Sequence, residues 1–149
     1  MTEALIRAAD ERDLSEVLAL YRHLHPQEPP LEAETAGRVW SVLLASGITT
    51  VIVAQVAAQL VSSCTLAIVP NLSRGGRPYG IIENVVTHAD HRRRGFGRRV
   101  LEHAIALAWR ADCHKVHLAT GSQRESTLRF YESAGFQRGS KTYFEIRRP

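Results

Sequence analysis

The sequence has no long apolar run, no paired-cysteine motif and no recognisable metal-binding motif. None of its apolar stretches approaches the roughly 18 residues that cross a bilayer, and its first residues lack a signal-peptide pattern. We therefore expect a cytoplasmic protein with no membrane partner. Its two cysteines, Cys64 and Cys113, do not form a CxxC motif, which favours reduced thiols in or near a core. The histidines show neither HExxH nor zinc-finger spacing, so we expect no metal site.

The excess of positive charge is small and local. The 149 residues include 19 basic and 15 acidic side chains, for a formal net charge of +4, and 44% of the residues are hydrophobic. That composition is ordinary for a soluble globular protein, and the length predicts a single domain over residues 1–149 with its own core. Two clusters, at residues 92–99 and 147–148, hold much of the excess charge. Such clusters suit a phosphate-bearing small molecule at least as well as a nucleic acid.

Hydrophobic periodicity predicts alternating helices and strands. Strand patterns occupy residues 3–8, 49–55, 60–69, 80–87, 115–119 and 142–146, and helical patterns occupy residues 11–24, 31–45, 96–110 and 125–134. Proline and glycine predict loops at residues 25–30 and 70–78. This order predicts an α/β protein with a mixed sheet, in which residues 79–119 contain a parallel crossover pair.

The most informative stretch is Arg-Arg-Arg-Gly-Phe-Gly at residues 92–97. It lies between the strand pattern that carries Glu83 and the helical pattern that starts at Phe96. The first N–H groups of a helix lack partners within the helix, and the helix dipole is positive there, so this turn can bind an anion. Glycines at 95 and 97 would let a phosphate approach those amides. We interpret the turn as a site for a diphosphate.

Other kinds of site compete for this turn. A dinucleotide-binding fingerprint would need a third glycine at position 100, which is Val100, and an acidic residue after the next strand. A Walker A loop is absent, and a DNA-binding helix-turn-helix would need a short helix where the strand pattern stands. On these residues alone, a structural strand-to-helix turn with solvated arginines remains open.

A second motif, Phe-Tyr-Glu-Ser-Ala-Gly-Phe at residues 130–136, narrows the choice. Residues 92–97 fit the pattern Arg/Gln-x-x-Gly-x-Gly/Ala and follow Val-Val-Thr at residues 85–87. Together the two motifs resemble the GNAT superfamily of acyl-CoA-dependent N-acyltransferases, most sharply over residues 80–137. The resemblance implies a mixed, mostly antiparallel sheet of six to seven strands with a central splayed parallel pair, flanked by about four helices. It also implies acetyl-CoA as co-substrate, and it is compatible with a homodimer.

The resemblance assigns roles to particular residues. The strand at residues 85–87 would bind the pantetheine arm through its backbone, and the amides of residues 93–98 would bind the pyrophosphate. Arg124 stands where the family often has asparagine, and it could contact a CoA phosphate instead. The implied cofactor-binding residues are Val85, Val86, Thr87, Arg92, Arg93, Arg94, Gly95, Phe96, Gly97, Arg98 and Arg124.

The chemistry requires a base and benefits from an acid. An alkylamine is mostly protonated at pH 7 and must lose a proton before it attacks a thioester. Glu83 is the candidate base, and strand alternation would place it on one face with Val85, unless a bulge changes that phase. A strand N–H near Val86 would stabilise the oxyanion. Tyr131, near the CoA sulfur in the resemblance, would protonate the departing thiolate.

Structural roles also remain open for both groups. Glu83 could instead pair with an arginine, and Tyr131 could simply pack in the core. Neither Cys64 nor Cys113 belongs to a recognisable Cys–His–Asp arrangement, so we do not expect an acylated cysteine.

The acceptor is the least determined part. The run Gly-Ile-Ile-Glu-Asn-Val-Val at residues 80–86 resembles glucosamine-phosphate N-acetyltransferases, and residues 118–120 with 129–131 resemble aminoalkylphosphonate acetyltransferases. The arginines at 74 and 77 could bind an anionic acceptor. We expect a small primary amine, ahead of a protein lysine or N-terminus. The alternative in another class is a non-catalytic CoA-sensing or basic nucleic-acid-binding domain, although nucleic acid is disfavoured.

Overall fold

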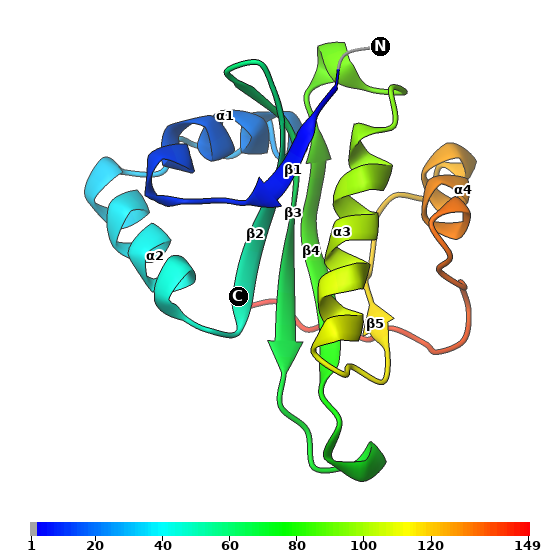
Figure 1. Cartoon of the computed structure of the whole chain (residues 1–149). Helices are drawn as coiled ribbons and strands as arrows, with labels where there is room; N and C mark the ends of the chain where they lie inside the picture. Colours follow the sequence, from blue (N-terminus) through cyan, green and yellow to red (C-terminus); the bar gives the residue numbers. More distant parts are fainter. Residues whose placement is uncertain (1–2) are drawn as a thin grey trace.

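A mixed sheet with helices on both faces forms the frame of the protein (Figure 1). The computed structural model describes residues 3–149. Its strands are β1 (Leu5–Ala8), β2 (Thr49–Val56), β3 (Gln59–Val69), β4 (Tyr79–Thr87) and β5 (Val116–His117). They lie in that order, antiparallel except for the parallel pair β4 and β5. The helices are α1 (Leu14–Leu24), α2 (Ala33–Ala45), α3 (Phe96–Arg110) and α4 (Glu125–Ser133), with 3₁₀ turns η1 (Glu11–Asp13), η2 (Arg74–Gly76) and η3 (Ala89–His91).

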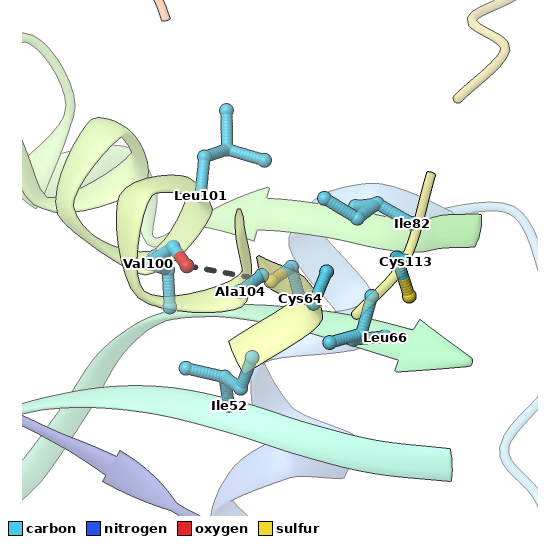
Figure 2. Close-up of a cluster of buried hydrophobic side chains, with 9 residues drawn as sticks. Ile52, Cys64, Leu66, Ile82, Val100, Leu101, Ala104 and Cys113 are labelled. Atoms are coloured by element: carbon cyan, nitrogen blue, oxygen red, sulfur yellow. Dashed lines mark hydrogen bonds between the residues drawn. The ribbon is translucent and has the colours of Figure 1, made fainter. Parts of the chain in front are cut away.

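Alternate strand residues fill two apolar cores, one on each face of the sheet. Ile52 of β2 belongs to the core under α3, whereas Val51 and Val53 belong to the core under α1 and α2. In Figure 2, Val100 and Ala104 of α3 meet the strand side chains of the first core. We call these the α3-side core and the α1-side core. The α3-side core comprises Ile52, Cys64, Leu66, Ile82, Val100, Leu101, Ala104, Ala108 and Cys113, and the α1-side core comprises Val17, Leu20, Trp40, Val51, Val53, Leu60 and Val86.

An ion pair ties the start of α1 to the edge of the sheet. The carboxylate of Asp13, a residue with 6% of its surface exposed, accepts hydrogen bonds from Arg7 at 2.7 and 2.9 Å. Arg7 also donates to Gln55 of β2, at 2.8 Å from its Nη2. The backbone N–H of Asp10 donates to Asp13 at 2.7 Å, so both oxygens of this carboxylate are engaged. The helix predicted for residues 11–24 therefore begins as the 3₁₀ turn η1 and becomes α-helical at Leu14.

The other predicted elements are largely confirmed. The helix at residues 96–110 agrees residue for residue, and the two long antiparallel strands differ from the prediction by one residue at most. The proline-rich segment 25–30 is irregular, as expected. Among residues 3–149, no helix combines the length and apolar character needed to cross a membrane.

The predicted strand at residues 142–146 is wrong, and with it the expected sheet of six to seven strands. The sheet has five strands, and residues 134–149 contain no strand or helix. The predicted strand at 115–119 shortens to two residues, so the parallel pair lies at the edge of the sheet, not at its centre. Because a strand forms only against another strand edge, the short β5 gives the last segment little to pair with. Its side chains Tyr143, Phe144 and Ile146 are 67%, 87% and 97% exposed.

The Arg7–Asp13 pair predicts a pH-dependent contribution to stability. Hydrogen bonds from Arg7 hold the pKa of Asp13 below its ordinary value. The pair therefore stabilises the fold fully above pH of about 4, where the unfolded carboxyl is ionised, and the contribution is lost as pH falls toward the folded pKa. We expect Asp13→Asn to lower the free energy of unfolding by about 1.5–3 kcal/mol at pH 7 and by much less at pH 3.

Urea unfolding at both pH values measures this difference. The exposed neighbour Glu11 provides the matched control, and Glu11→Gln should change stability by about 0.5 kcal/mol or less. An equal loss at pH 7 and pH 3 for Asp13→Asn would show that the charge of Asp13 is not the source of its stabilisation.

Candidate active site

A β-bulge in β4 sets the direction of the predicted site residues. On β3, Ser63 and Thr65 are two positions apart, whereas their partners on β4, Val86 and Glu83, are three apart. The extra residue is accommodated at Asn84, whose φ of 53° lies in the left-handed region. From this point onward, the alternation of the β4 side chains between the two faces of the sheet is shifted by one residue.

The changed phase corrects the facing expected from simple alternation. Ile82 belongs to the α3-side core, and Val85, three residues later, packs against the same core. Val86 belongs to the α1-side core. Glu83 follows Ile82 directly and so lies on the opposite face of the sheet from α3. Glu83 and Val85, which alternation would put on one face, are thus on opposite faces.

The end of β4 is held by side-chain hydrogen bonds from β3. The buried hydroxyl of Ser62 donates to the carbonyl of Val86 at 2.9 Å and lies 2.9 Å from the Thr87 hydroxyl. The guanidinium of Arg92 donates to the Thr87 carbonyl at 3.2 Å. These contacts fix the strand that leads into the turn at residues 92–97.

The turn presents a row of unused backbone donors at the start of α3. The first helical hydrogen bond runs from the N–H of Arg99 to the carbonyl of Gly95, at 3.1 Å. The amides of residues 93–98 make no hydrogen bond to any part of the chain that the structure describes. Gly95 and Arg93 adopt left-handed φ values of 83° and 60°, which turn the chain into the helix. Free N–H groups at the positive end of a helix are the kind of donor that a pyrophosphate would accept from.

The two glycines of the turn serve different purposes. A Cβ at Gly95 would have no atom within 4 Å, so glycine is needed there for its left-handed backbone. A Cβ at Gly97 would lie 3.1 Å from the Thr87 hydroxyl and 3.2 Å from the Phe130 ring. Gly97 is buried and lets the first turn of α3 contact both β4 and α4. Gly97 therefore has a packing role that the sequence-based interpretation did not include.

The arginine side chains around the turn are partly occupied within the protein. Arg94 lies 3.2 Å from His91, and Arg98 forms an ion pair with Glu102 at 2.8 Å. Arg93 makes no side-chain contact of this kind among the described residues, and the same holds for Arg124, which is exposed at the start of α4. Arg93 and Arg124 are therefore the cations of this region with the fewest ties to the rest of the fold.

Tyr131 stands opposite β4, on α4. It packs against the α3-side core, as Val85 does, with its ring 5.1 Å from that of Phe130. Burial raises the pKa of Tyr131, so its hydroxyl stays protonated at neutral pH and can donate a proton. The pairing of β4 with β5 ends at Ile81 and His117, which leaves the β4 edge beyond Ile81 without a strand partner in residues 3–149. That open edge lies where the resemblance implies the pantetheine arm.

Glu83 is exposed and makes no hydrogen bond or ion pair with any described residue. The alternative in which it serves as a structural partner for an arginine therefore finds no support. An exposed carboxylate beside a bulge is free to accept a proton from a bound molecule.

Tyr21 of α1 lies near the bulge, which the sequence did not reveal. Burial raises the pKa of Tyr21, and its neighbours Thr65 and Asn84 oppose the rise. In the sequence it is one of several apolar-face residues of a helix, and only the fold brings it to the bulge.

Both cysteines lie inside the protein. Cys64 is fully buried, and burial raises its pKa to about 12, so a thiolate is not available at neutral pH. Cys113 is also buried, and burial raises its pKa. Within the described residues there is no group of three or more metal-ligating side chains.

The surroundings of Gly97 and Gly37 predict opposite effects of alanine substitution on the stability of the protein. We expect Gly97→Ala to lower the free energy of unfolding by about 1–3 kcal/mol, because the added methyl group must displace Thr87 or Phe130. A methyl group at Gly37 in α2 would meet no atom within 4 Å, so Gly37→Ala should instead stabilise the helix by about 0.5–1 kcal/mol. Urea unfolding of the two variants measures both effects. Equal stability of Gly97→Ala and the wild type would refute the packing role.

Comparison with known proteins agrees with this geometry. The family model for the acetyltransferase (GNAT) family matches residues 4–136. The glucosamine 6-phosphate N-acetyltransferase of Trypanosoma brucei brucei is 34% identical over 133 residues, which cover 89% of this chain and 88% of that protein.

Solved structures show the same similarity. A putative acetyltransferase from Agrobacterium tumefaciens str. C58 has 46% identity and a TM-score of 0.93, covering 97% of this chain and 99% of that one. A Trypanosoma brucei acetyltransferase has 30% identity and a TM-score of 0.81, covering 99% of each chain. The chain belongs to the GNAT family and is an acetyl-CoA-dependent acyltransferase.

Proposed function

We propose that the enzyme transfers an acetyl group from acetyl-CoA directly to the primary amine of a small molecule, with glucosamine 6-phosphate as the leading candidate. The observation that carries this proposal is the layout of β4. An unpaired carboxylate, Glu83, stands just before the bulge, and the unused amides of residues 93–98 follow the end of the same strand. The relative from Trypanosoma brucei brucei, named for glucosamine 6-phosphate, supports the choice of acceptor.

The residues of the chain supply the remaining functions. Acetyl-CoA brings an acetyl group that its thioester activates. The amides of residues 93–98 bind its pyrophosphate, assisted by Arg93 and Arg124. Glu83 accepts the proton that the acceptor amine must lose, directly or through water. Tyr131, protonated because burial raises its pKa, donates a proton to the departing sulfur, and a backbone N–H near Val86 stabilises the carbonyl oxygen.

Loss of the base should slow turnover without loss of the co-substrate. We expect Glu83→Gln to lower kcat by about 10²-fold or more, since proton removal by a positioned base contributes on that scale. A thiol-release assay with acetyl-CoA and glucosamine 6-phosphate measures it, with Glu11→Gln as the control. Tyr131→Phe should have a smaller effect, because a thiol of pKa about 8.5 leaves readily as a thiolate.

Binding and catalysis can be separated in the same experiment. Acetyl-CoA should raise the Tm of the wild type and of both variants. If it raises none of them, the co-substrate assignment is wrong. If Glu83→Gln keeps wild-type turnover between pH 6 and 9, Glu83 is not the base. Stabilisation of the wild type without turnover of any amine would favour a CoA-sensing protein instead.

The exposed end of the chain offers a surface for a second copy. Phe144 and Ile146 are 87% and 97% exposed, and their alternate positions put them on one side of an extended segment. Tyr143 and Glu145, at the intervening positions, bond to one another at 2.9 Å. An apolar side and a polar side are the pattern of a strand that is covered on one face. We propose that a second copy of the chain covers Phe144 and Ile146 in a homodimer.

Removal of these two apolar side chains should release monomers. We expect the wild type to sediment at twice the 16.6 kDa of the chain and the double variant Phe144→Ser, Ile146→Ser to sediment as a monomer. Leu72, which is 99% exposed on the loop between β3 and β4, provides the control, and Leu72→Ser should remain dimeric. A monomeric wild type at micromolar concentration would rule out this dimer.

A further inference from the structure

A second group of cations lies at the opposite end of β4 from the glycine turn. It surrounds Tyr79, the first residue of the strand. The ammonium group of Lys115 lies 5.7 Å from the centre of the Tyr79 ring, and the His117 ring stacks on the same ring at 6.0 Å. His114 meets its edge at 6.4 Å. Backbone hydrogen bonds of 2.9 Å, from Gly80 to the Lys115 carbonyl and from His114 to the Pro78 carbonyl, hold the group in place.

The cations of this group lack acidic partners. Lys141, on the segment after α4, lies close enough to Lys115 for its positive charge to act on that ammonium group. Partial burial lowers the pKa of Lys115, and the neighbouring charges of Lys141 and Arg74 lower it further. Neither lysine, nor Arg74, forms an ion pair within the described part of the chain. Like charges held together without a counter-charge favour a bound anion.

One of the two arginines on the loop at residues 70–78 already forms an ion pair within the protein. Both loop arginines lie close enough to His114 to lower its pKa, but Arg77 pairs with Asp112 at 3.0 Å, whereas Arg74 forms no ion pair within the described residues. The lysines therefore carry most of the positive charge that is available to a ligand.

The cation group and Glu83 lie on the same face of the sheet. A Cβ at Gly80 would touch Ala108 of α3, so Gly80 faces α3 and its neighbours Tyr79 and Ile81 face away. Glu83, two residues after Ile81 and before the bulge, shares that face. His117 pairs with Ile81 and lies between the two ends. Burial lowers the pKa of His117, the two lysines lower it further, and Glu83 opposes them, which places His117 within reach of both charges.

The four residue-to-residue steps from Tyr79 to Glu83 span about 13 Å along the strand. That span is short enough for a phosphorylated sugar, together with the length of the lysine and glutamate side chains, to bridge the lysines and the carboxylate. Two ammonium groups supply several N–H donors and the charge that balances a phosphoryl dianion.

We infer that Lys115 and Lys141, with His117 beside them, bind the phosphoryl group of the acceptor whose amine faces Glu83. This inference rests on the proposed N-acetyl transfer. It makes the acceptor a phosphorylated amine whose amine and phosphoryl groups are about one sugar ring apart. An amine without a phosphoryl group would leave the positive charges of the lysines unbalanced and would bind more weakly.

The test compares glucosamine 6-phosphate with glucosamine, which lacks only the phosphoryl group. For Lys115→Gln and for Lys141→Gln, we expect KM for glucosamine 6-phosphate to rise about 10-fold or more. Turnover of glucosamine and KM for acetyl-CoA should not change. Arg77→Gln, whose guanidinium is paired with Asp112, is the matched control and should behave as the wild type. The phosphonate 2-aminoethylphosphonate, which is too short to reach both ends, should be a poor acceptor.

The outcomes separate this inference from the proposed function. Equal kcat/KM of the wild type for glucosamine and its 6-phosphate, or equal losses for both in the lysine variants, would overturn the phosphoryl site. If no amine is acetylated, calorimetric titration of the wild type and the double lysine variant with glucosamine 6-phosphate still decides it. If the wild type binds glucosamine 6-phosphate and the double variant does not, the phosphoryl site is supported even though no transfer occurs. If the wild type does not bind it, the site is refuted.

Discussion

The extra residue at Asn84 in β4 is the constraint on which the site depends. A regular strand would send Glu83 and Val85 to the same face, and one of them would then be misplaced. The bulge sends Val85 into the α3-side core and leaves Glu83 exposed on the other face, without a partner among the described residues. It also lies in the stretch whose edge β5 leaves unpaired. A single backbone irregularity thus separates the facing of Val85 from that of Glu83, which stays exposed beside the open edge of the strand.

β4 then organises two electrostatic sites of different physical kinds. At its end, backbone amides at the start of α3 offer fixed dipoles, and several arginines are tied to Glu102, His91 or backbone carbonyls. At its beginning, the ammonium groups of Lys115 and Lys141 lack acidic partners among the described residues. Fixed amides suit a ligand held in one geometry, whereas lysines on flexible stems suit a charged group whose position varies. One strand can therefore serve a co-substrate at one end and an acceptor at the other.

Local signals in the sequence predicted most helices and strands and the glycine-containing turn before α3. The period of α3 and the glycine-containing turn are properties of a continuous segment, and the structure agrees with both. The packing role of Gly97 was not predicted, since its neighbours Thr87 and Phe130 come from other elements. The strand at 142–146 failed for a related reason. Its alternating pattern is present, but β5 ends too early to offer an edge for it.

By itself, the sequence determined most of the helical and extended segments, the glycine-containing turn at the start of a helix, and which family the chain resembles. These follow from neighbouring residues, because propensity, periodicity and capping act over one or two turns of chain. Only the tertiary structure decided that Tyr21 reaches Asn84, that Glu83 stands alone, and that Lys141 lies beside Lys115. Those relations join residues far apart in the chain, and the register of β4 and the packing of separate elements create them.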